Sequence, residues 1–391
     1  MKLSVSALLL RTILAAALLL TAACTVNPVT GEKELSMLSQ EQEIAIGEKQ
    51  YQNSQQSQGG LYYLDPALQS YINDIGQQLA RVSHRPDLPY EFVVLNSGVP
   101  NAWALPGGKL AINRGLLIHL DDEAELAAVL GHEIVHAAAG HGAAQMSQGQ
   151  LLSIGAQLAA IASQIGGYGN LGGQAAQLGG AAWMAKYGRD DELESDAFGM
   201  EYMAKVGYDP QGAVELQQTF VRLSNNKQTD FVSGLFASHP PSQERVKANQ
   251  RMAATLPAGK RNKDRYQQHI AQLKKDQPAY DAQEKAMKAI KDKKYDQAMI
   301  LIERAIEVQP RESEFWEIKG QLLEHKKQFK QAEQAYSRAV DNNPDYFRPV
   351  LLRGLLRFEQ GDHVAAAADL QHSYNILPTQ IAADHLNKLK Q

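Results

Sequence analysis

The segment His132-Glu133-Ile134-Val135-His136 combines two imidazoles and a carboxylate at a spacing that suits metal chemistry. Residues four apart share one face of a helix, so His132 and His136 can bind the same ion. Glu133 lies about 100° further around the helix, close enough to take a proton from a water held at that ion. The trio predicts a zinc site for peptide-bond hydrolysis with Glu133 as the general base, and the alternative is a chance triplet of buried core residues.

The surrounding residues predict a helix from roughly Glu123 to Ala139. Asp122 followed by Glu125 resembles a capping box, and Gly140 is a natural C-terminal stop. The apolar stripe of this helix continues through the metal-binding trio, which should therefore be buried. A buried carboxylate needs a compensating charge. Because no Lys or Arg occurs nearby in the sequence, between positions 114 and 186, a divalent cation is the expected partner.

Two histidines leave the coordination incomplete, and a later acidic run offers a third ligand. It contains Glu192 and Asp196, again four residues apart. One carboxylate could bind the metal while the other orients a ligand histidine through its free N–H. The alternative is a solvated acidic helix face. His141 is not expected to bind, because nine residues after His132 it would project from the opposite side of the helix.

Two further segments complete a set of motifs that resembles a known family. They are Asn101-Ala102-Trp103-Ala104-Leu105-Pro106-Gly107-Gly108 and His239-Pro240-Pro241, the latter followed by Arg245. With the motifs above, the chain resembles the HtpX-like and CAAX-prenyl-protease-like zinc endopeptidases of the gluzincin group, over about residues 35 to 251. The resemblance implies one zinc ion per chain.

The resemblance also implies roles for single residues. Glu192 would be the third zinc ligand beside the two histidines, Glu133 the general base, and Asp196 the outer partner of a ligand. His239 and Arg245 would lie across the cleft and stabilise the oxyanion of the tetrahedral intermediate. In some relatives the corresponding histidine approaches the metal and holds the enzyme closed, so His239 is either catalytic or inhibitory. A third possibility is a histidine that only marks a helix entry.

Residues 90 to 113 contain two strand-like stretches separated by a Pro-Gly-Gly turn. They predict a small sheet beside the zinc helix. Its exposed edge, at Asn101, Ala102, Trp103 and Ala104, could pair with an extended peptide. Backbone pairing depends little on side chains, so we expect broad specificity for unfolded protein. Alternatively, the sheet only supports the helix.

The N-terminus predicts export. Residues 1–23 read as a lipoprotein signal peptide, because a short apolar core ends in small residues before Cys24, the only cysteine in the chain. The apolar core is too short to span a bilayer. Thr25 follows in place of an aspartate, which by resemblance to Gram-negative lipoproteins favours the outer membrane. We expect a periplasmic protein anchored through lipidated Cys24.

The stretch from Ala137 to Ala185 has no Asp, Glu, Lys or Arg and is rich in Ala, Gly and Gln. Glutamines interrupt each apolar run, so a membrane span is not expected. We predict a helical hairpin over residues 145–185, either a moving lid on the cleft or an ordinary buried pair.

The C-terminal third is repetitive. Small residues and prolines recur every 34 residues, a period typical of tetratricopeptide repeats. The series are Pro310, Pro344 and Pro378; Ala298, Ala332 and Ala366; Ala286, Gly320 and Gly354; Tyr295, Phe329 and His363; and Ala305, Ala339 and Ser373. About three repeats and a capping helix are expected at 279–391, after a linker or bridging helix at 256–278 and a peptidase domain at 24–255. Such stacks bind peptides or partner proteins in a concave groove.

These elements predict a mostly α (α+β) chain, with a zincin-like metallopeptidase domain, a small β-sheet and an α-solenoid. A formal charge of −4 and the absence of a phosphate-binding loop argue against nucleic-acid or nucleotide binding. The pairing of domains resembles the BepA-like periplasmic branch of the family, which implies cleavage of unfolded or misassembled envelope proteins and contact with outer-membrane assembly machinery. The alternative is a chaperone-like assembly scaffold whose zinc site is mostly closed.

Overall fold

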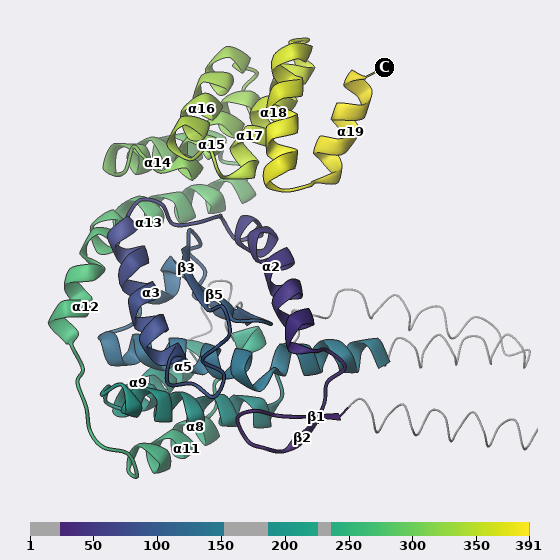
Figure 1. Ribbon diagram of the computed structural model, residues 1–391. Coiled ribbons are helices and arrows are strands. Elements are labelled where there is room, and N and C mark those ends of the chain that lie inside the picture. The colour runs from purple at the N-terminus through teal and green to yellow at the C-terminus, as the bar shows by residue number, and fades with distance from the viewer. Residues whose placement is uncertain (1–23, 152–186, 226–235, 391) are drawn as a thin grey trace, which may run out of the picture.

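The structure is a computed structural model that describes residues 24–151, 187–225 and 236–390. The predicted signal peptide and most of the predicted hairpin at 145–185 lie outside the described residues. An N-terminal part with a small sheet and several helices is followed by a stack of helices that lies across one side of it (Figure 1). None of the described helices is both long and apolar enough to cross a bilayer.

Helix α5 (Glu123–Ala139) runs through the core of the N-terminal part, and every one of its residues is buried. Its bounds confirm the prediction. The Asp122 carboxylate accepts hydrogen bonds from the backbone N–H groups of Ala124 and Glu125, and Gly140 ends the helix with a φ of +79°. Glu125 accepts from the N–H of Asp121, so the expected reciprocal capping box is shifted by one residue.

A three-stranded sheet lies beside α5, in the order β3 (Glu91–Leu95), β5 (Lys109–Asn113), β4 (Ala102–Leu105). Strand β3 pairs with β5 in parallel, and β4 pairs with β5 antiparallel. The tight connection between β4 and β5 requires Gly107 and Gly108, which both have positive φ. Strand β4 is thus an edge strand, and it contacts α5.

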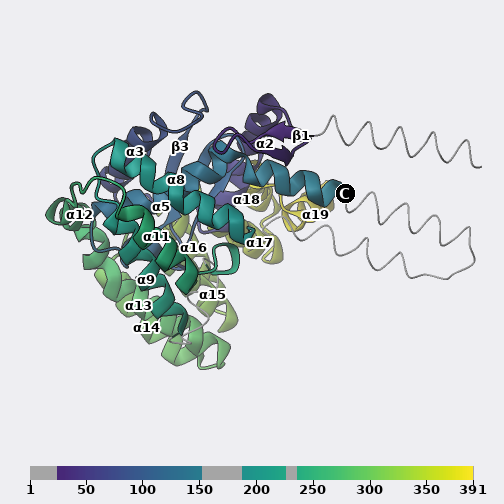
Figure 2. The same cartoon turned by 90° about the horizontal axis from the view of Figure 1, so that it is seen from below.

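Other N-terminal elements cover this centre. Helix α3 (Pro66–Ala80) packs on both α5 and β3, and α2 (Gln40–Ser57) contacts β4 and β5. A hairpin of β1 (Cys24–Val26) and β2 (Lys33–Leu35) precedes them. A short helix, α4 (Arg114–Leu117), follows β5 directly. On the opposite side of α5 lie α8 (Arg189–Lys205), α9 (Gln211–Asn225) and α11 (Gln243–Ala253), which Figure 2 shows as neighbours. Helices α8 and α9 both contact α5, and α11 contacts both α8 and α9.

The crossing of α5 and α8 is close because glycines meet there. A Cβ atom built on Gly131 would lie 3.0 Å from the carbonyl oxygen of Gly199, and one built on Gly199 would lie 3.0 Å from the backbone nitrogen of His132. The first turn of α8 is acidic, which suits a helix N-terminus, and it contains Glu192. The close approach of the two backbones brings this turn towards the histidines of α5.

Substituting Gly131 with valine should therefore disturb both stability and metal binding. The added side chain meets backbone rather than flexible side-chain atoms, so we expect a loss of about 1–3 kcal/mol in the free energy of unfolding. Urea unfolding and zinc titration measure the two effects. Gly149→Val is the matched control, because an added Cβ at this exposed helical glycine meets nothing within 4 Å. Equal effects at both positions would contradict the prediction.

The C-terminal part consists of three antiparallel helix pairs and a final helix, as expected for tetratricopeptide repeats. The helices are α13 (Ala271–Lys291), α14 (Tyr295–Val308), α15 (Ser313–His325), α16 (Phe329–Asn342), α17 (Phe347–Glu359), α18 (His363–Ile376) and α19 (Gln380–Leu389). The repeating alanines Ala298, Ala332 and Ala366 are fully buried, because these positions lie where neighbouring helices meet. The predicted fold class is confirmed.

The interval 256–278, predicted as a linker or bridging helix, is more deeply packed than its polar composition indicates. It contains α12 (Lys263–His269) and the start of α13, so the predicted boundary at residue 279 falls inside a helix. Tyr266, Ile270 and Leu273 are fully buried in the same core as α3 and α5. These few apolar residues anchor the segment in the core. The average composition of the segment, which is polar and charged, did not indicate that they would be buried.

The repeats also bond directly to the N-terminal part. The Tyr63 hydroxyl donates to the carbonyl of Arg311 at 2.6 Å and accepts from the N–H of Ser313 at 2.7 Å. The Asn96 amide donates to the buried Glu312 carboxylate at 3.0 Å. These contacts hold the connection between α14 and α15 against the N-terminal part.

Candidate metal centre

Four buried side chains converge where α5, α8 and the segment before α11 meet. They are His132, His136, Glu192 and His239, and each offers one ligand atom within 4.8 Å of the others. The Nε2 atoms of His132 and His136 are 3.1 Å apart, and each lies near one oxygen of Glu192, at 3.6 and 3.4 Å respectively. Two imidazoles and a carboxylate form a typical donor set for zinc. The structure thus brings together the three residues proposed as ligands.

Asp196 holds His132 from the outside. Its Oδ1 atom lies 2.9 Å from Nδ1 of His132. Burial opposes ionisation of Asp196, but the neighbouring Arg245 and His132 outweigh this effect and lower the pKa of the carboxyl. An ionised carboxylate only accepts hydrogen bonds, so Nδ1 of His132 carries the proton and Nε2 is left free to bind a metal. This is the arrangement expected for the partner of a ligand histidine.

The guanidinium group of Arg245, on α11, donates hydrogen bonds to two buried carboxylates. It donates to the two oxygens of Asp196 at 2.8 and 2.7 Å, and to Oε2 of Glu192 at 2.5 Å. This geometry supports a role in positioning charge rather than the oxyanion contact inferred from resemblance. Arg245 thus supplies a positive charge to Glu192 and Asp196. The expectation of a divalent cation concerned Glu133, whose pKa Arg245 lowers less than His239 and His132 do.

Glu133 is buried beside the cluster. Its Oε1 atom lies 3.5 Å from Nε2 of His239, and its Oε2 atom has no hydrogen-bond partner among the described residues. Burial raises the pKa of Glu133, and the nearby His239 and His132 only partly oppose this shift. A buried acceptor without a partner is costly unless a ligand or water uses it. The atom is therefore available to a water at the cluster.

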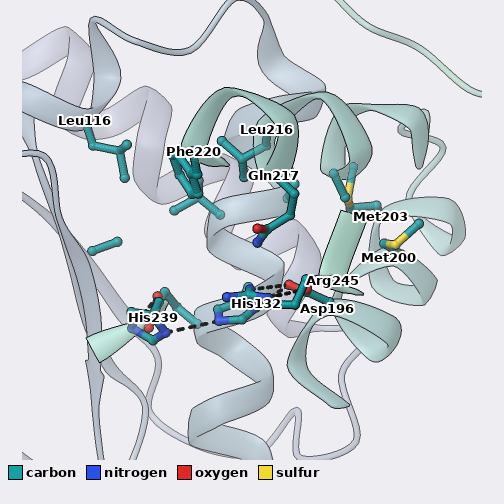
Figure 3. Close-up of a pocket in the computed structure, with 15 residues that line it drawn as sticks. Leu116, His132, Asp196, Met200, Met203, Leu216, Gln217, Phe220, His239 and Arg245 are labelled. Atoms are coloured by element: carbon teal, nitrogen blue, oxygen red, sulfur yellow. Dashed lines mark hydrogen bonds and ion pairs between the residues drawn. The ribbon is translucent and has the colours of Figure 1, made fainter. Parts of the chain in front are cut away.

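His239 lies within the cluster itself. Its Nδ1 atom is 2.8 Å from Oε1 of Glu192 and 3.3 Å from Nε2 of His132, as Figure 3 shows for the His132 contact. Burial opposes protonation of His239, but Glu133 and Glu192 raise its pKa. The entry to α11 is capped by Ser242, whose side chain accepts from the N–H of Arg245. The helix-entry explanation of His239 is thus weakened, while the catalytic and inhibitory roles both stay open.

Two hollows meet at this cluster. A groove of about 240 Å³ follows the edge of β4 and reaches His239, and Asn101, Trp103, Ala104 and Tyr187 line it. A smaller, mainly apolar cavity of about 30 Å³ is bordered by His132 and His239 (Figure 3), and its lining includes Val129, Met200, Met203, Leu216 and Phe220. Ala102, which is buried, lines this second cavity. The predicted edge strand thus borders both hollows next to the candidate metal site.

The sequence missed two aromatic neighbours of His136. The Tyr187 ring stacks on the His136 ring, with centroids 3.9 Å apart and an interplanar angle of 22°. His141 was expected on the opposite side of the helix, which was wrong, because its Nδ1 atom lies 2.8 Å from Nδ1 of His136. Helix α5 ends at Ala139, and the left-handed Gly140 turns the chain back. That stop was predicted, so it could have shown that a helical projection does not extend to His141.

Comparison with known proteins supports this reading of the chain. Residues 66–253 match the family described as Peptidase family M48, and residues 284–347 and 327–379 match a tetratricopeptide repeat family. A putative beta-barrel assembly-enhancing protease of Vibrio cholerae is 29% identical over 238 residues, which cover 59% of this chain and 48% of the relative. A beta-barrel assembly-enhancing protease of Yersinia pestis is 32% identical over 191 residues, which cover 47% of this chain and 38% of the relative.

The chain spans about half the length, or less, of these curated relatives. Among solved structures, the first TPR of Spaghetti (RPAP3) bound to an HSP90 peptide aligns with 30% of this chain and 93% of that chain, at 26% identity and a TM-score of 0.29. The family matches fall on the two parts of the fold described above. Residues 66–253 of this chain thus match the peptidase family M48, and the helices that follow match tetratricopeptide repeats.

Proposed function

We propose that this protein is a zinc endopeptidase that cleaves unfolded or misassembled proteins of the Gram-negative envelope. The observation that carries the proposal is the convergence of His132, His136 and Glu192, with Glu133 beside them, whose Oε2 atom no described residue hydrogen-bonds. The family match to residues 66–253 supports peptide-bond hydrolysis as the reaction. Zinc is the ion that best suits two neutral imidazoles and a carboxylate.

In this mechanism His132, His136 and Glu192 would hold one zinc ion, which would supply Lewis acidity to a peptide carbonyl and to the attacking water. Glu133 accepts the proton of the attacking water and returns it to the nitrogen of the leaving amine. Burial raises the pKa of Glu133, which makes its carboxylate a stronger base than an exposed one. Asp196 keeps His132 in the required tautomer.

Substrate binding follows from the edge strand. An extended peptide can add to the edge of β4 that no described strand pairs with, at Ala102, Trp103 and Ala104 and at Asn101 just before them. It would then lie along the groove that reaches His239. Main-chain pairing selects for extended segments rather than for a particular sequence. Folded proteins rarely expose such segments, so unfolded or misassembled proteins are the expected substrates.

The cellular setting is also part of the proposal. Cys24, the proposed lipid attachment site, begins β1, and the names of the relatives from Vibrio cholerae and Yersinia pestis refer to beta-barrel assembly. We infer a periplasmic protein anchored in the outer membrane, whose repeats dock clients or assembly partners. Metabolic labelling with a palmitate analogue, compared between wild type and Cys24→Ser, tests the anchor. Label retained by the variant would contradict it.

Metal removal tests the proposed reaction. Wild type should cleave unfolded casein, lose this activity with a chelator and regain it when zinc is added back. The reason is that the Lewis acidity comes from the ion while the protein scaffold persists without it. Gel assays of casein fragments and elemental analysis of the protein measure the two halves of the claim. Cleavage that persists in metal-free protein would exclude the mechanism.

A second candidate function, a scaffold with a mostly closed site, is favoured by the position of His239. This side chain is 2.8 Å from Glu192 and so occupies the space beside the ligand atoms. If His239 keeps the site closed, His239→Ala should raise casein cleavage severalfold, because an extended peptide then gains access. If His239 acts in catalysis, the same substitution should lower kcat with a smaller effect on KM. Steady-state kinetics of the variant separate these roles, and unchanged kinetics would exclude both.

A further inference from the structure

The Nδ1 atoms of the two histidines of α5 that are proposed to bind zinc have different partners. Nδ1 of His132 contacts the Asp196 carboxylate directly, at 2.9 Å. The atom within hydrogen-bonding distance of Nδ1 of His136 is instead Nδ1 of another histidine, His141, at 2.8 Å. His141 is 3% exposed, so water does not readily replace this contact. A contact between two ring nitrogens constrains where both protons can be.

The positions of the protons follow from the proposed metal site. If Nε2 of His136 binds the ion, its Nδ1 carries a proton and donates it to Nδ1 of His141. His141 is then the acceptor, and as a neutral ring it carries its own proton on Nε2. That Nε2 atom has no hydrogen-bond partner among the described residues and lies 3.5 Å from Oε1 of Glu194. The N–H group therefore faces a carboxylate.

The same residues could be mistaken for a second metal site. Glu34, His141 and Glu194 offer ligand atoms within 4.8 Å of one another. However, a metal on Nε2 of His141 would move the proton of that ring to Nδ1, which would then donate to His136. His136 would have to carry its proton on Nε2, and it could no longer bind the first ion. With neutral rings, the two metal sites exclude each other.

We propose that His141 is a positioning residue, which together with Glu194 fixes the orientation and tautomer of His136. This inference rests on the proposed function, because it concerns the same metal site. Glu194 is in turn held by the N-terminal hairpin. The Asn27 side chain donates to Oε1 of Glu194 at 3.0 Å and to Oε1 of Glu34 at 2.8 Å. The hairpin that begins at Cys24 thus supports the metal site through a carboxylate and a histidine.

The test compares the zinc affinity of full-length variants by competition with a chromophoric chelator. His141→Leu removes the acceptor and should weaken zinc binding by about 10- to 100-fold. His141→Gln keeps an acceptor in its amide oxygen and should recover most of the affinity, which a purely structural role would not predict. Glu194→Gln should weaken binding relative to Glu201→Gln, a matched control on α8, and this pair carries the test if His141→Leu does not fold.

Several outcomes would overturn the inference. One is wild-type affinity in both His141→Leu and Glu194→Gln, and another is an equal loss in His141→Leu and His141→Gln. A third is binding of two zinc ions by wild type with one lost in Glu34→Gln, because His141 would then be a ligand. Failure of the proposed function looks different. Wild type that binds zinc but does not cleave casein would exclude the peptidase while leaving the affinity comparison intact.

Discussion

Glu133→Gln should abolish peptide cleavage while the protein still binds a single zinc ion. Glutamine keeps the shape of the side chain but cannot accept the proton of the attacking water, and loss of a general base typically lowers kcat by about 10²- to 10⁴-fold. The proposed ligands His132, His136 and Glu192 are unchanged. Casein cleavage measures the first effect, and elemental analysis of the purified variant measures the second.

Stability provides an internal check on this experiment. Burial raises the pKa of Glu133, which means that the charged form is unfavourable in the folded protein. A neutral glutamine removes that cost, so the variant should unfold at the same temperature as wild type or higher. Lost activity then cannot be attributed to unfolding. Glu201→Gln, the same charge change on neighbouring α8, should leave cleavage unaffected, and full activity in Glu133→Gln would refute the assigned base.

The sequence predicted the parts of the site that depend on local structure. Asp122 and Gly140 act on the helix within one turn of themselves, so the bounds of α5 could be inferred from the residues alone. The 34-residue period likewise placed the repeat helices, because each repeat packs mainly on its sequence neighbours. Helical spacing indicated that one of Glu192 and Asp196 would orient a ligand histidine, and the family resemblance assigned this role to Asp196. The structure identifies the histidine as His132.

The remaining features depend on how distant segments fold together. Tyr187 belongs to no motif. Its ring stacks on His136 and its N–H donates to the carbonyl of Ser238, and both contacts join segments far apart in the sequence. The charge of Arg245 was foreseen as part of the site, but not its contacts, because they depend on the crossing of α11 with α8. Similarly, Tyr266 lies in a segment whose mean composition is polar, and its burial reflects individual contacts with Leu117 and its neighbours.

Of the proposed substitutions, Arg245→Met should lower the free energy of unfolding of the metal-free protein most. Methionine fills a similar volume, but Glu192 and Asp196 would be left as buried carboxylates without their cation. Removing one partner of a buried ion pair typically costs about 3–5 kcal/mol. Urea unfolding of chelator-treated protein measures this free energy. The loss should be smaller when zinc is bound, because the ion compensates part of the same negative charge.

Two companion variants define the cause of that effect. Arg251→Met, an exposed arginine on the same helix, should change the free energy of unfolding little. Arg245→Lys should have an intermediate effect, since one ammonium group cannot span both carboxylates as the planar guanidinium does. Metal-free Arg245→Met could be as stable as wild type only if Glu192 and Asp196 became protonated, and so neutral, at little cost in free energy. Arg245 would then not be the cation that allows an acidic cluster to be buried before zinc binds.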